Sequence, residues 1–405
     1  MPYGDVFDGV KVVDFGWILA GPIVSKFLAD HGATVVWIES MKKPDLSRVS
    51  SPYKDGIAGV NRTGYFALWA ANKYSINIDL SKPRSKELAK RLVAWADVVS
   101  ENRRPGVMEK MGLGYDELKK IKPDIIMIRS SNQGQTGPFA AHPGLGNNLN
   151  GLAGFNSFVG WADEEPISLM VAYADFLAPP LAVTALIAAL DYRRKTGEGQ
   201  LLDMSQLEAS LQYLMPPLLN CSINGVENRK MGNAHPYAAP HGVYRCKGED
   251  RWCAIAVLDD AEWKRFCTVI GDAPWTQDPK FSTLMLRKEN EEELNKLVEA
   301  WTLNHSAEEV MHLLQEASIA AGVVKNGEDI CEDPQLKERG LYWVMEHNEL
   351  EAFTHLGQPY ILSKTPARPY RPAPCLGEHT EYVCKHLLGM SEEEFVELLT
   401  GDVFE

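Results

Sequence analysis

Residues 7–39 read FDGVKVVDFGWILAGPIVSKFLADHGATVVWIE. Within this stretch Val10 to Asp14 is predicted as a buried strand, Pro22 to Asp30 as a helix with proline at its first position, and Thr34 to Glu39 as the next strand. Alternation of this kind favours a mostly parallel sheet that is covered by helices.

The same alternation continues to about residue 130. The further predicted elements are strands at Ser75 to Leu80, Val98 to Glu101 and Asp124 to Arg129, and a helix at Ser85 to Ala96. We therefore expect an α/β protein with a Rossmann-like parallel sheet. Ligands of such sheets bind at the carboxyl ends of the strands. The relevant turns follow Val13, Ile38, Leu80 and Glu101.

Length and composition limit the class of protein. A chain of 405 residues with 45% hydrophobic residues predicts two domains. The net charge of −14 argues against a nucleic-acid partner or an anionic membrane surface. Seven cysteines without a C-x-x-C pair fit reduced thiols in the cytoplasm. The longest apolar run, residues 176–190, contains two prolines, so no membrane insertion is expected.

Several cofactor motifs are missing. The only near match to a dinucleotide loop is Gly144-Leu-Gly-Asn-Asn-Leu149, which lacks the third glycine. Neither a P-loop, a G-x-S-x-G elbow nor an H-E-x-x-H pair occurs. His235 and His241 are interpreted as hydrogen-bonding loop residues rather than metal ligands. We expect neither a prosthetic group nor a metal.

Asp175 is the candidate catalytic residue. It precedes an apolar helix pattern from Leu181 to Leu190, and a helix N-terminus favours an ionised, oriented carboxylate. This arrangement suits a carboxylate nucleophile. The alternative is that Asp175 only caps its helix, because aspartate is a preferred N-cap residue.

A second block begins near His235. Gly242 to Cys246 and Trp252 to Val257 are predicted paired strands, followed by helices from Ala261 and from Asn290 to Leu303. The predicted division is a large α/β domain of residues 1–222 completed by 376–405, a small α/β domain of residues 235–330, and linkers at 223–234 and 331–375. The second linker contains a proline-rich segment from Lys364 to Pro374.

A series of short motifs in fixed order resembles the class III CoA-transferases, the formyl-CoA and carnitine CoA-transferase family. The motifs are Phe7 to Asp14, Ala20-Gly-Pro22, Leu28 to Ala33 and Glu39, then Asn72-Lys73, Glu101-Asn102, Gly134 to Pro138, Ala174-Asp175, Lys195 to Gly199, Gly232-Asn233, Asp333 to Leu336 and Leu376 to His379. Their order across nearly the whole chain makes the resemblance specific. It implies the α/β fold above, with a smaller second domain, in an interlocked dimer.

The resemblance implies a covalent mechanism on Asp175. The aspartate attacks an acyl-CoA thioester and forms a mixed anhydride, and an aspartyl-CoA thioester follows before CoA passes to an acceptor acid. Oxyanions need N–H donors, which the family supplies partly from a loop whose counterpart is Met231-Gly232-Asn233-Ala234. One glycine in place of a glycine run argues against a mobile lid.

By resemblance, CoA contacts the turns at the carboxyl ends of the strands. The expected contacts are Leu19, Ala20, Ser40, Ile78, Asp79, Leu80, Ser81, Asn102, Arg103, Arg104 and Lys110. Of these, Arg103, Arg104 and Lys110 are the expected phosphate partners, since arginine and lysine are the usual donors to anions. Lys42, Lys43 and Arg48 are reserves. For any one of them, a solvated surface charge is the alternative.

Two rival functions stay open. An α-methylacyl-CoA racemase needs a histidine where this chain has Leu145 in Gly144-Leu145-Gly146, so a transferase is favoured. A catalytically silent subunit of a heteromer is the second rival, and the partner is expected to be a second copy or a homologous subunit. Succinyl-CoA is the expected donor. Residues Leu145 and Gly146 suggest a roomier acceptor pocket, and Phe155, Phe158 and Trp161 suggest an aromatic acid such as benzylsuccinate.

Overall fold

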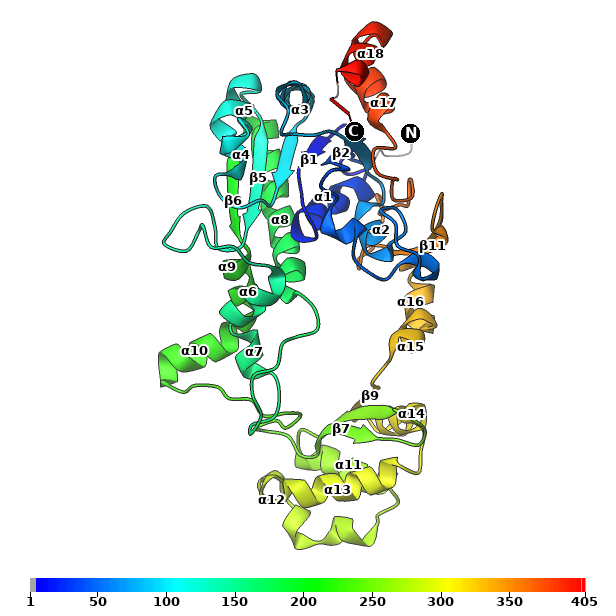
Figure 1. Cartoon of the computed structure of the whole chain (residues 1–405). Coiled ribbons are helices and arrows are strands. Elements are labelled where there is room, and N and C mark those ends of the chain that lie inside the picture. Colours follow the sequence, from blue (N-terminus) through cyan, green and yellow to red (C-terminus); the bar gives the residue numbers. More distant parts are fainter. Residues whose placement is uncertain (1–4, 402, 405) are drawn as a thin grey trace. The chain divides into compact units, whose positions relative to one another are not determined.

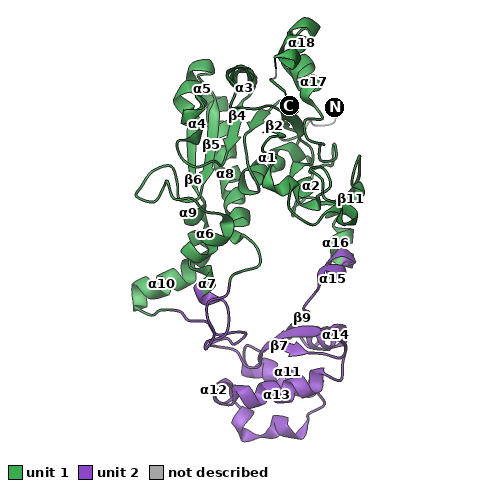
Figure 2. Cartoon of the chain, in the orientation of Figure 1, with its two compact units in different colours: residues 1–156, 168–227, 335–405 green, residues 157–167, 228–334 purple. Residues whose placement is uncertain are grey.

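The computed structural model describes residues 5–401, 403 and 404, and it forms two compact units (Figures 1 and 2). Unit 1 consists of Met1–Asn156, Ser168–Glu227 and Gln335–Glu405, and unit 2 of Ser157–Ile167 and Asn228–Pro334. Each unit has its own hydrophobic core.

Unit 1 contains a six-stranded parallel sheet with the order β3-β2-β1-β4-β5-β6. The predicted Rossmann-like sheet is confirmed, since this order is that of the doubly wound dinucleotide-binding fold. The strands are β1 (Lys11–Asp14), β2 (Thr34–Glu39), β3 (Tyr74–Asn77), β4 (Val98–Glu101), β5 (Ile126–Ser131) and β6 (Leu201–Ser205). Sequence analysis missed β6.

Alternating side chains fill both faces of this sheet. Val12 pairs with Val35 and faces helices α1 (Ala20–Asp30) and α8 (Tyr173–Thr196), while Val13 pairs with Val36 and faces α3 (Pro83–Trp95). Because both faces are buried here, the central strands β1 and β2 carry uninterrupted apolar runs, Val12-Val13 and Val35 to Ile38. The other helical segments of unit 1 are η1 (Leu46–Arg48), η2 (Lys54–Gly56), α2 (Gly64–Ala70), α4 (Val107–Lys110), α5 (Tyr115–Ile121), α6 (Gly146–Leu152), α9 (Gln206–Leu211), η3 (Gln212–Leu214) and α10 (Met215–Asn224).

The C-terminal part of the chain packs on unit 1. Residues 331–375, predicted as a linker, contain a two-stranded antiparallel sheet of β10 (Tyr342–His347) and β11 (Glu351–Leu356). Leu350 and Phe353 of this hairpin pack on α2, so its burial anchors the segment. The last helical segments, α17 (Thr380–Tyr382), η6 (Val383–Leu387) and α18 (Glu392–Thr400), place Val383 and Phe395 in the core under α3.

Unit 2 is a smaller α/β body. Its antiparallel sheet has the order β7-β8-β9, with β7 (His241–Arg245), β8 (Trp252–Ala256) and β9 (Ala320–Val323). The sheet packs on helices through Trp263, Phe266 and Val298. The helical segments are α11 (Asp260–Val269), η4 (Pro274–Gln277), η5 (Pro279–Phe281), α12 (Leu284–Glu289), α13 (Glu291–Thr302), α14 (Ala307–Glu316) and α15 (Gly327–Cys331); α7 (Phe155–Phe158) and α16 (Pro334–Glu338) lie at the unit boundaries.

One helix in the described part of the chain, α8, is long and apolar enough to cross a membrane by length and composition. Core helices of soluble proteins pass the same test. Here α8 packs with Ala182, Val183 and Leu186 against the apolar face of the parallel sheet, which accounts for its composition.

Candidate active site

The turn after β1 forms one wall of the site. The Gly16 N–H donates to Oδ1 of Asp14 over 2.7 Å, and the Trp17 N–H donates to Oδ1 of Asn102 over 2.7 Å. The Asn102 amide donates back to the Trp17 carbonyl over 2.8 Å. Ile18 has a φ of 65°, which is strained for a β-branched residue, and its N–H is held by Asp45. The turn is thereby fixed with Trp17 presented on its surface.

A buried ion pair stabilises the turn after β1. Asp14 forms an ion pair with Lys73 over 3.1 Å and accepts a short hydrogen bond from Ser25, and all three residues are buried. The Lys73 ammonium also donates to the Pro22 carbonyl over 2.9 Å. The motif residues Asp14 and Lys73 therefore organise the first turn and the start of α1.

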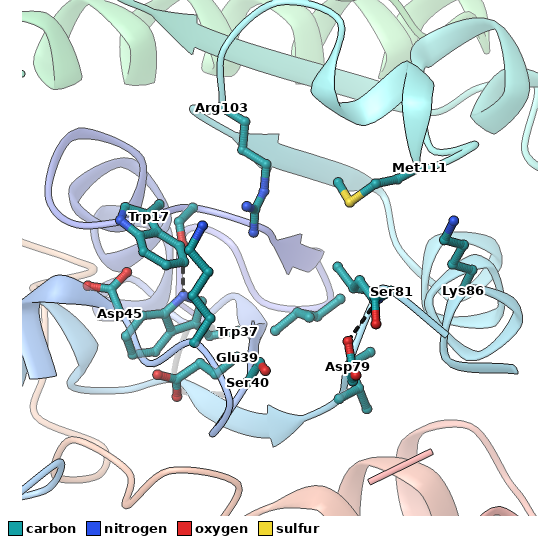
Figure 3. A pocket seen from close by; sticks show the side chains of 15 residues that line it. Trp17, Trp37, Glu39, Ser40, Asp45, Asp79, Ser81, Lys86, Arg103 and Met111 are labelled. Atoms are coloured by element: carbon teal, nitrogen blue, oxygen red, sulfur yellow. Dashed lines mark hydrogen bonds between the residues drawn. The ribbon is translucent and has the colours of Figure 1, made fainter. Parts of the chain in front are cut away.

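A cavity of about 350 Å³ opens at the carboxyl ends of β2 and β3 (Figure 3). Six of the predicted CoA contacts line it, namely Ser40, Ile78, Asp79, Leu80, Ser81 and Arg103. Lys42 and the Ser81 N–H hold the pKa of Asp79 far below its usual range, so Asp79 is ionised. Lys86 from α3 adds a cation that sequence analysis missed.

A second cavity, of about 720 Å³, contains Asp175. We call it the Asp175 cavity. It brings together residues from the turns after β1, β4 and β5 and from the starts of α6, α8 and α9. The predicted site residues that line it are Leu19, Ala20, Asn102, Arg103, Arg104, Leu145, Gly146 and Asp175.

Trp17, Lys43 and Arg103 line both cavities, so the two cavities adjoin at these residues. The Trp17 ring centroid lies 4.9 Å from Lys43 Nζ and 5.7 Å from the Arg103 guanidinium carbon. The Arg103 Nε is buried and has no hydrogen-bond partner within the described residues. Burial lowers the pKa of Arg103, while Glu101 opposes the shift. An unpaired, partly desolvated guanidinium at this junction is suited to an anionic ligand.

Asp175 is the third residue of α8 and does not cap it. Ala172 occupies the N-cap position, and the described helix start shows no side-chain capping bond, so the capping alternative is wrong. Pro179 has no N–H to donate to the Asp175 carbonyl four residues earlier, so the first turn of α8 lacks this helical hydrogen bond.

Burial dominates the electrostatics of Asp175. It raises the pKa of the carboxyl to about 6, and a hydrogen bond from Gln206 opposes the shift. Asp175 lies in the first turn of α8, as expected, but burial rather than the helix N-terminus dominates its pKa. The carboxylate is ionised at neutral pH but poorly solvated, and poor solvation makes a carboxylate more basic and more nucleophilic.

Three neighbours fix the Asp175 carboxylate. The Gln206 amide donates to Oδ1 over 3.2 Å. Buried Asn150 of α6 donates to the Val171 carbonyl and accepts from the Ala174 N–H, which ties the start of α8 to α6. A Cβ built at Gly146 would lie 2.8 Å from Asp175 Cγ and closer still to Oδ2. The carboxylate already fills this space, so Gly146 does not enlarge the acceptor pocket.

Several expected residues lie elsewhere. Lys110 is exposed at the end of α4 and lines neither cavity. Arg48 is fully buried and uses all five of its N–H donors on Glu39, Asn61, Val60 and Pro374, so it is not a reserve phosphate partner. The aromatic residues at 155, 158 and 161 do not line the Asp175 cavity.

The loop of residues 231–234 belongs to unit 2. The Gly232 N–H donates to the Gly160 carbonyl over 2.9 Å, and a Cβ at Gly232 would collide with the Trp161 ring. The Asn233 carbonyl lies 2.7 Å from His241 Nδ1. Asn233 and Trp161 line a separate cavity of about 420 Å³ in unit 2. These contacts anchor the loop within its own unit.

Among the lining residues of the two cavities that sequence reasoning missed are Trp17, Tyr65, Lys86 and Gln206. Trp17 lies three residues after the end of β1 and could have been found by that position. Burial, and after it the charge of Asp175, raises the pKa of the Tyr65 hydroxyl, but no sequence motif marks this residue. Gln206 follows β6, and it was missed because the strand itself was missed.

Comparisons with known proteins show what the chain as a whole is similar to. The model of CoA-transferase family III matches residues 7–380. The succinyl-CoA–D-citramalate CoA-transferase of Chloroflexus aurantiacus is 32% identical, with 96% of each chain covered. The succinate–glutarate CoA-transferase of Agrobacterium fabrum is 32% identical over 94% of this chain and 95% of its own. The crystal structure of a CaiB/BaiF family protein from Brucella suis superposes with a TM-score of 0.87 at 31% identity, covering 95% of this chain and all of that one.

Proposed function

This chain belongs to CoA-transferase family III and is a CoA-transferase, and on that premise we propose that it moves CoA from succinyl-CoA to a dicarboxylic acid through covalent intermediates on Asp175. The observation that carries the proposal is the partly buried Asp175 carboxylate, whose side-chain hydrogen-bond donor is neutral and whose cavity adjoins a second, cation-bearing cavity.

The proposed reaction has four exchanges. An Asp175 oxygen attacks the thioester carbonyl carbon of succinyl-CoA, the C–S bond breaks with its electron pair on sulfur, and a succinyl-aspartyl anhydride and CoA thiolate result. The thiolate attacks the Asp175 carboxyl carbon and releases succinate. The acceptor carboxylate then displaces the thiolate from this aspartyl thioester. Finally the thiolate attacks the acceptor carbonyl carbon, which frees Asp175 and the new acyl-CoA.

The two adjoining cavities suit an extended ligand. We place the adenosine end of CoA at Ser40 and at residues 78–81, and the thioester at Asp175. Arg103 and Arg104 are assigned to the phosphates, with Lys43 beside them at the junction, because oriented cations bind phosphate oxygens well. Because Lys110 lines neither cavity, it would contact only a part of CoA that extends beyond both of them. The loop at Gly232 and Asn233 stays a proposed source of an oxyanion donor on the family resemblance alone; since the Gly232 N–H already donates to the Gly160 carbonyl, the donor would be a group of Asn233.

The acceptor class follows from the relatives, whose names specify citramalate and glutarate, both dicarboxylic acids. Benzylsuccinate, an aromatic dicarboxylic acid, is the narrower form of the proposal. Tyr65 and Trp17 are the aromatic side chains that line the Asp175 cavity, and either could contact a phenyl group. Among the described residues that line this cavity there is no histidine, which speaks against the racemase alternative.

The assembly is proposed to be a dimer, either of identical chains or with a homologous subunit. Helix α10 buries none of its residues within the single chain, and Leu218, Leu219 and Ile223 are exposed on it. An exposed apolar helix of this kind is typical of an interface. All seven cysteines are free thiols, which supports a reducing compartment such as the cytoplasm. Native mass spectrometry of the chain expressed alone should give a dimer that is active; a monomer without activity would favour the heteromer.

The test is a transfer assay with succinyl-CoA and a panel of acids that contains glutarate, citramalate and benzylsuccinate, with new acyl-CoA products identified by mass. Wild-type protein should form product with at least one dicarboxylic acid. Asp175→Asn should abolish transfer, whereas Asp191→Asn, at an ion-paired surface position near the other end of α8, should not. Transfer by Asp175→Asn would contradict the mechanism, and products from aliphatic acids alone would exclude the aromatic acceptor.

A further inference from the structure

The two oxygens of Asp175 lie in different surroundings. Oδ1 accepts a hydrogen bond from Gln206 Nε2 over 3.2 Å, whereas Oδ2 lies against Gly146 at the start of α6. Within the described residues Asp175 forms no ion pair, so its one side-chain donor is a neutral amide. A neutral donor orients a carboxylate without the strong charge neutralisation that a cation would bring.

Gln206 is held in a position from which its amide can orient Oδ1 of Asp175. It is 3% exposed and is the first residue of α9, directly after β6. Strand β6 is paired with β5 as far as Ser205, and the Ser205 hydroxyl accepts a hydrogen bond from the Glu208 N–H to cap α9. The Gln206 carbonyl accepts from the Ser210 hydroxyl over 2.8 Å. The amide is therefore presented from a backbone that the central sheet fixes.

We propose that Gln206 is a catalytic oxyanion donor that divides the work between the two oxygens of Asp175. This inference rests on the proposed function above. Oδ2 attacks the succinyl-CoA carbonyl carbon, and the electron pair of the broken C–S bond goes to the CoA sulfur. Oδ1 becomes the carbonyl oxygen of the aspartyl anhydride and stays bonded to the Gln206 amide.

The largest effect is expected at the second and third exchanges. There the CoA thiolate or the acceptor carboxylate attacks the Asp175 carboxyl carbon, and a full negative charge develops on Oδ1. This is the atom to which Gln206 donates, so the hydrogen bond strengthens as the charge forms. In the first and fourth exchanges the charge develops on the carbonyl oxygen of the succinyl group or of the acceptor, to which Gln206 is not proposed to donate.

Loss of the Gln206 donor should change the relative amounts of the two covalent intermediates. Gln206→Met keeps the length of the side chain and removes the donor, so aspartyl-CoA thioester should form slowly from the anhydride. Loss of one oxyanion donor costs on the order of 10²-fold in kcat. The KM for succinyl-CoA should stay within about twofold, because a donor that acts only on developing charge does not change ground-state binding.

The experiment is rapid-quench intact-protein mass spectrometry after mixing with succinyl-CoA, together with steady-state kinetics. Wild-type protein should carry mainly the CoA adduct, and Gln206→Met mainly the succinyl adduct with kcat lowered about 10²-fold. Gln212→Met, an exposed glutamine in the segment that follows α9, is the matched control and should behave as wild type. If Gln206→Met does not fold, Gln206→Leu is measured in the same way.

The outcomes separate the two proposals. If Gln206→Met showed the same ratio of the two adducts as the wild type, with a kcat within about threefold of the wild-type value, the role of Gln206 would be overturned and the covalent mechanism would stay intact. A parallel loss of both adducts with a raised KM would identify a merely structural role and would overturn it as well. Absence of any adduct on wild-type protein would overturn this inference together with the proposed function.

Discussion

Replacement of Gly146 by alanine tests whether the Asp175 carboxylate must lie where the structure has it. A Cβ at residue 146 would lie 2.8 Å from Asp175 Cγ and closer to Oδ2, whereas ordinary contact begins at 3.4 Å. It would also collide with Ala172, the N-cap residue of α8, so movement in either direction shifts the turn that carries Asp175. The displacement is about 1 Å, and a misplacement of this size costs about 10²-fold in rate.

The fold should survive this change. Alanine is better than glycine inside a helix by about 0.5–1 kcal/mol, which partly offsets about 1–3 kcal/mol of overpacking. The assay is kcat/KM for succinyl-CoA with the best acceptor, with thermal unfolding in parallel. Gly151→Ala in the same helix is the matched control, because its Cβ would meet only the Asn156 amide at 3.8 Å. If Gly146→Ala were as active as Gly151→Ala, with wild-type stability, the steric reasoning would be wrong.

Three further predictions concern charge. Since burial raises the pKa of Asp175 to about 6, kcat/KM should fall about tenfold per pH unit below about pH 6 as the nucleophile is protonated; a flat profile between about pH 5 and pH 8 would contradict this. Because the pKa of Asp175 is higher in the folded than in the unfolded chain, the ionised carboxylate destabilises the fold. Denaturant unfolding of Asp175→Asn should therefore give a free energy of unfolding about 1–2 kcal/mol above that of the wild type at pH 8, after allowance for partial exposure. This gain should vanish as the pH falls towards 3.8. Arg103→Ala should raise the KM for succinyl-CoA about tenfold or more, because a charge-assisted contact is lost. Lys110→Ala should raise this KM less, and Arg84→Ala, at a surface ion pair outside both cavities, should leave it unchanged. Equal effects of Arg103→Ala and Lys110→Ala would refute the placement of Arg103 at the junction.

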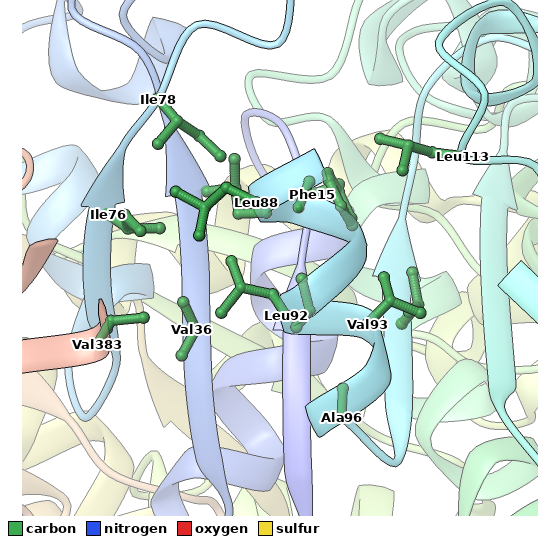
Figure 4. Packing of buried hydrophobic residues seen from close by; sticks show 14 of the residues in the cluster. Phe15, Val36, Ile76, Ile78, Leu88, Leu92, Val93, Ala96, Leu113 and Val383 are labelled. Carbon is green, nitrogen blue, oxygen red and sulfur yellow. The ribbon is translucent and has the colours of Figure 1, made fainter. Parts of the chain in front are cut away.

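Hydrophobic periodicity was sufficient to predict most of the large sheet. The paired valines of β1 and β2 mark buried strands, and helix α3 was recognised from its apolar stripe, with Leu88 and Leu92 packed on Val36 (Figure 4). Strand β6 escaped because it lies at the edge of the sheet and alternates exposed with partly buried residues, so it has no continuous apolar run. The hairpin of β10 and β11 escaped for the same reason, since most of its residues are exposed or partly buried.

The site was predictable only where a residue type implies its chemistry. Asp175 could be proposed from its place before an apolar helix, but its pKa could not, because burial raises it and the Gln206 hydrogen bond opposes the rise; Gly146, which lies against the carboxylate, and Gln206 are 29 or more positions away in the sequence. Arg48 shows the opposite error. It lies in a basic stretch, yet the fold turns it inwards to a buried ion pair with Glu39, a contact that no local pattern encodes.

The central claim, that Asp175 carries the reaction covalently, is tested most directly by trapping with hydroxylamine. Wild-type protein and Asp175→Ala are incubated with succinyl-CoA and hydroxylamine, and the modified peptide is located by mass spectrometry beside a transfer assay. The account predicts a hydroxamate at Asp175 in the wild type alone, with loss of transfer in both the trapped protein and the variant. Transfer activity that persists in Asp175→Ala, with no hydroxamate at Asp175 in the wild type, would contradict it.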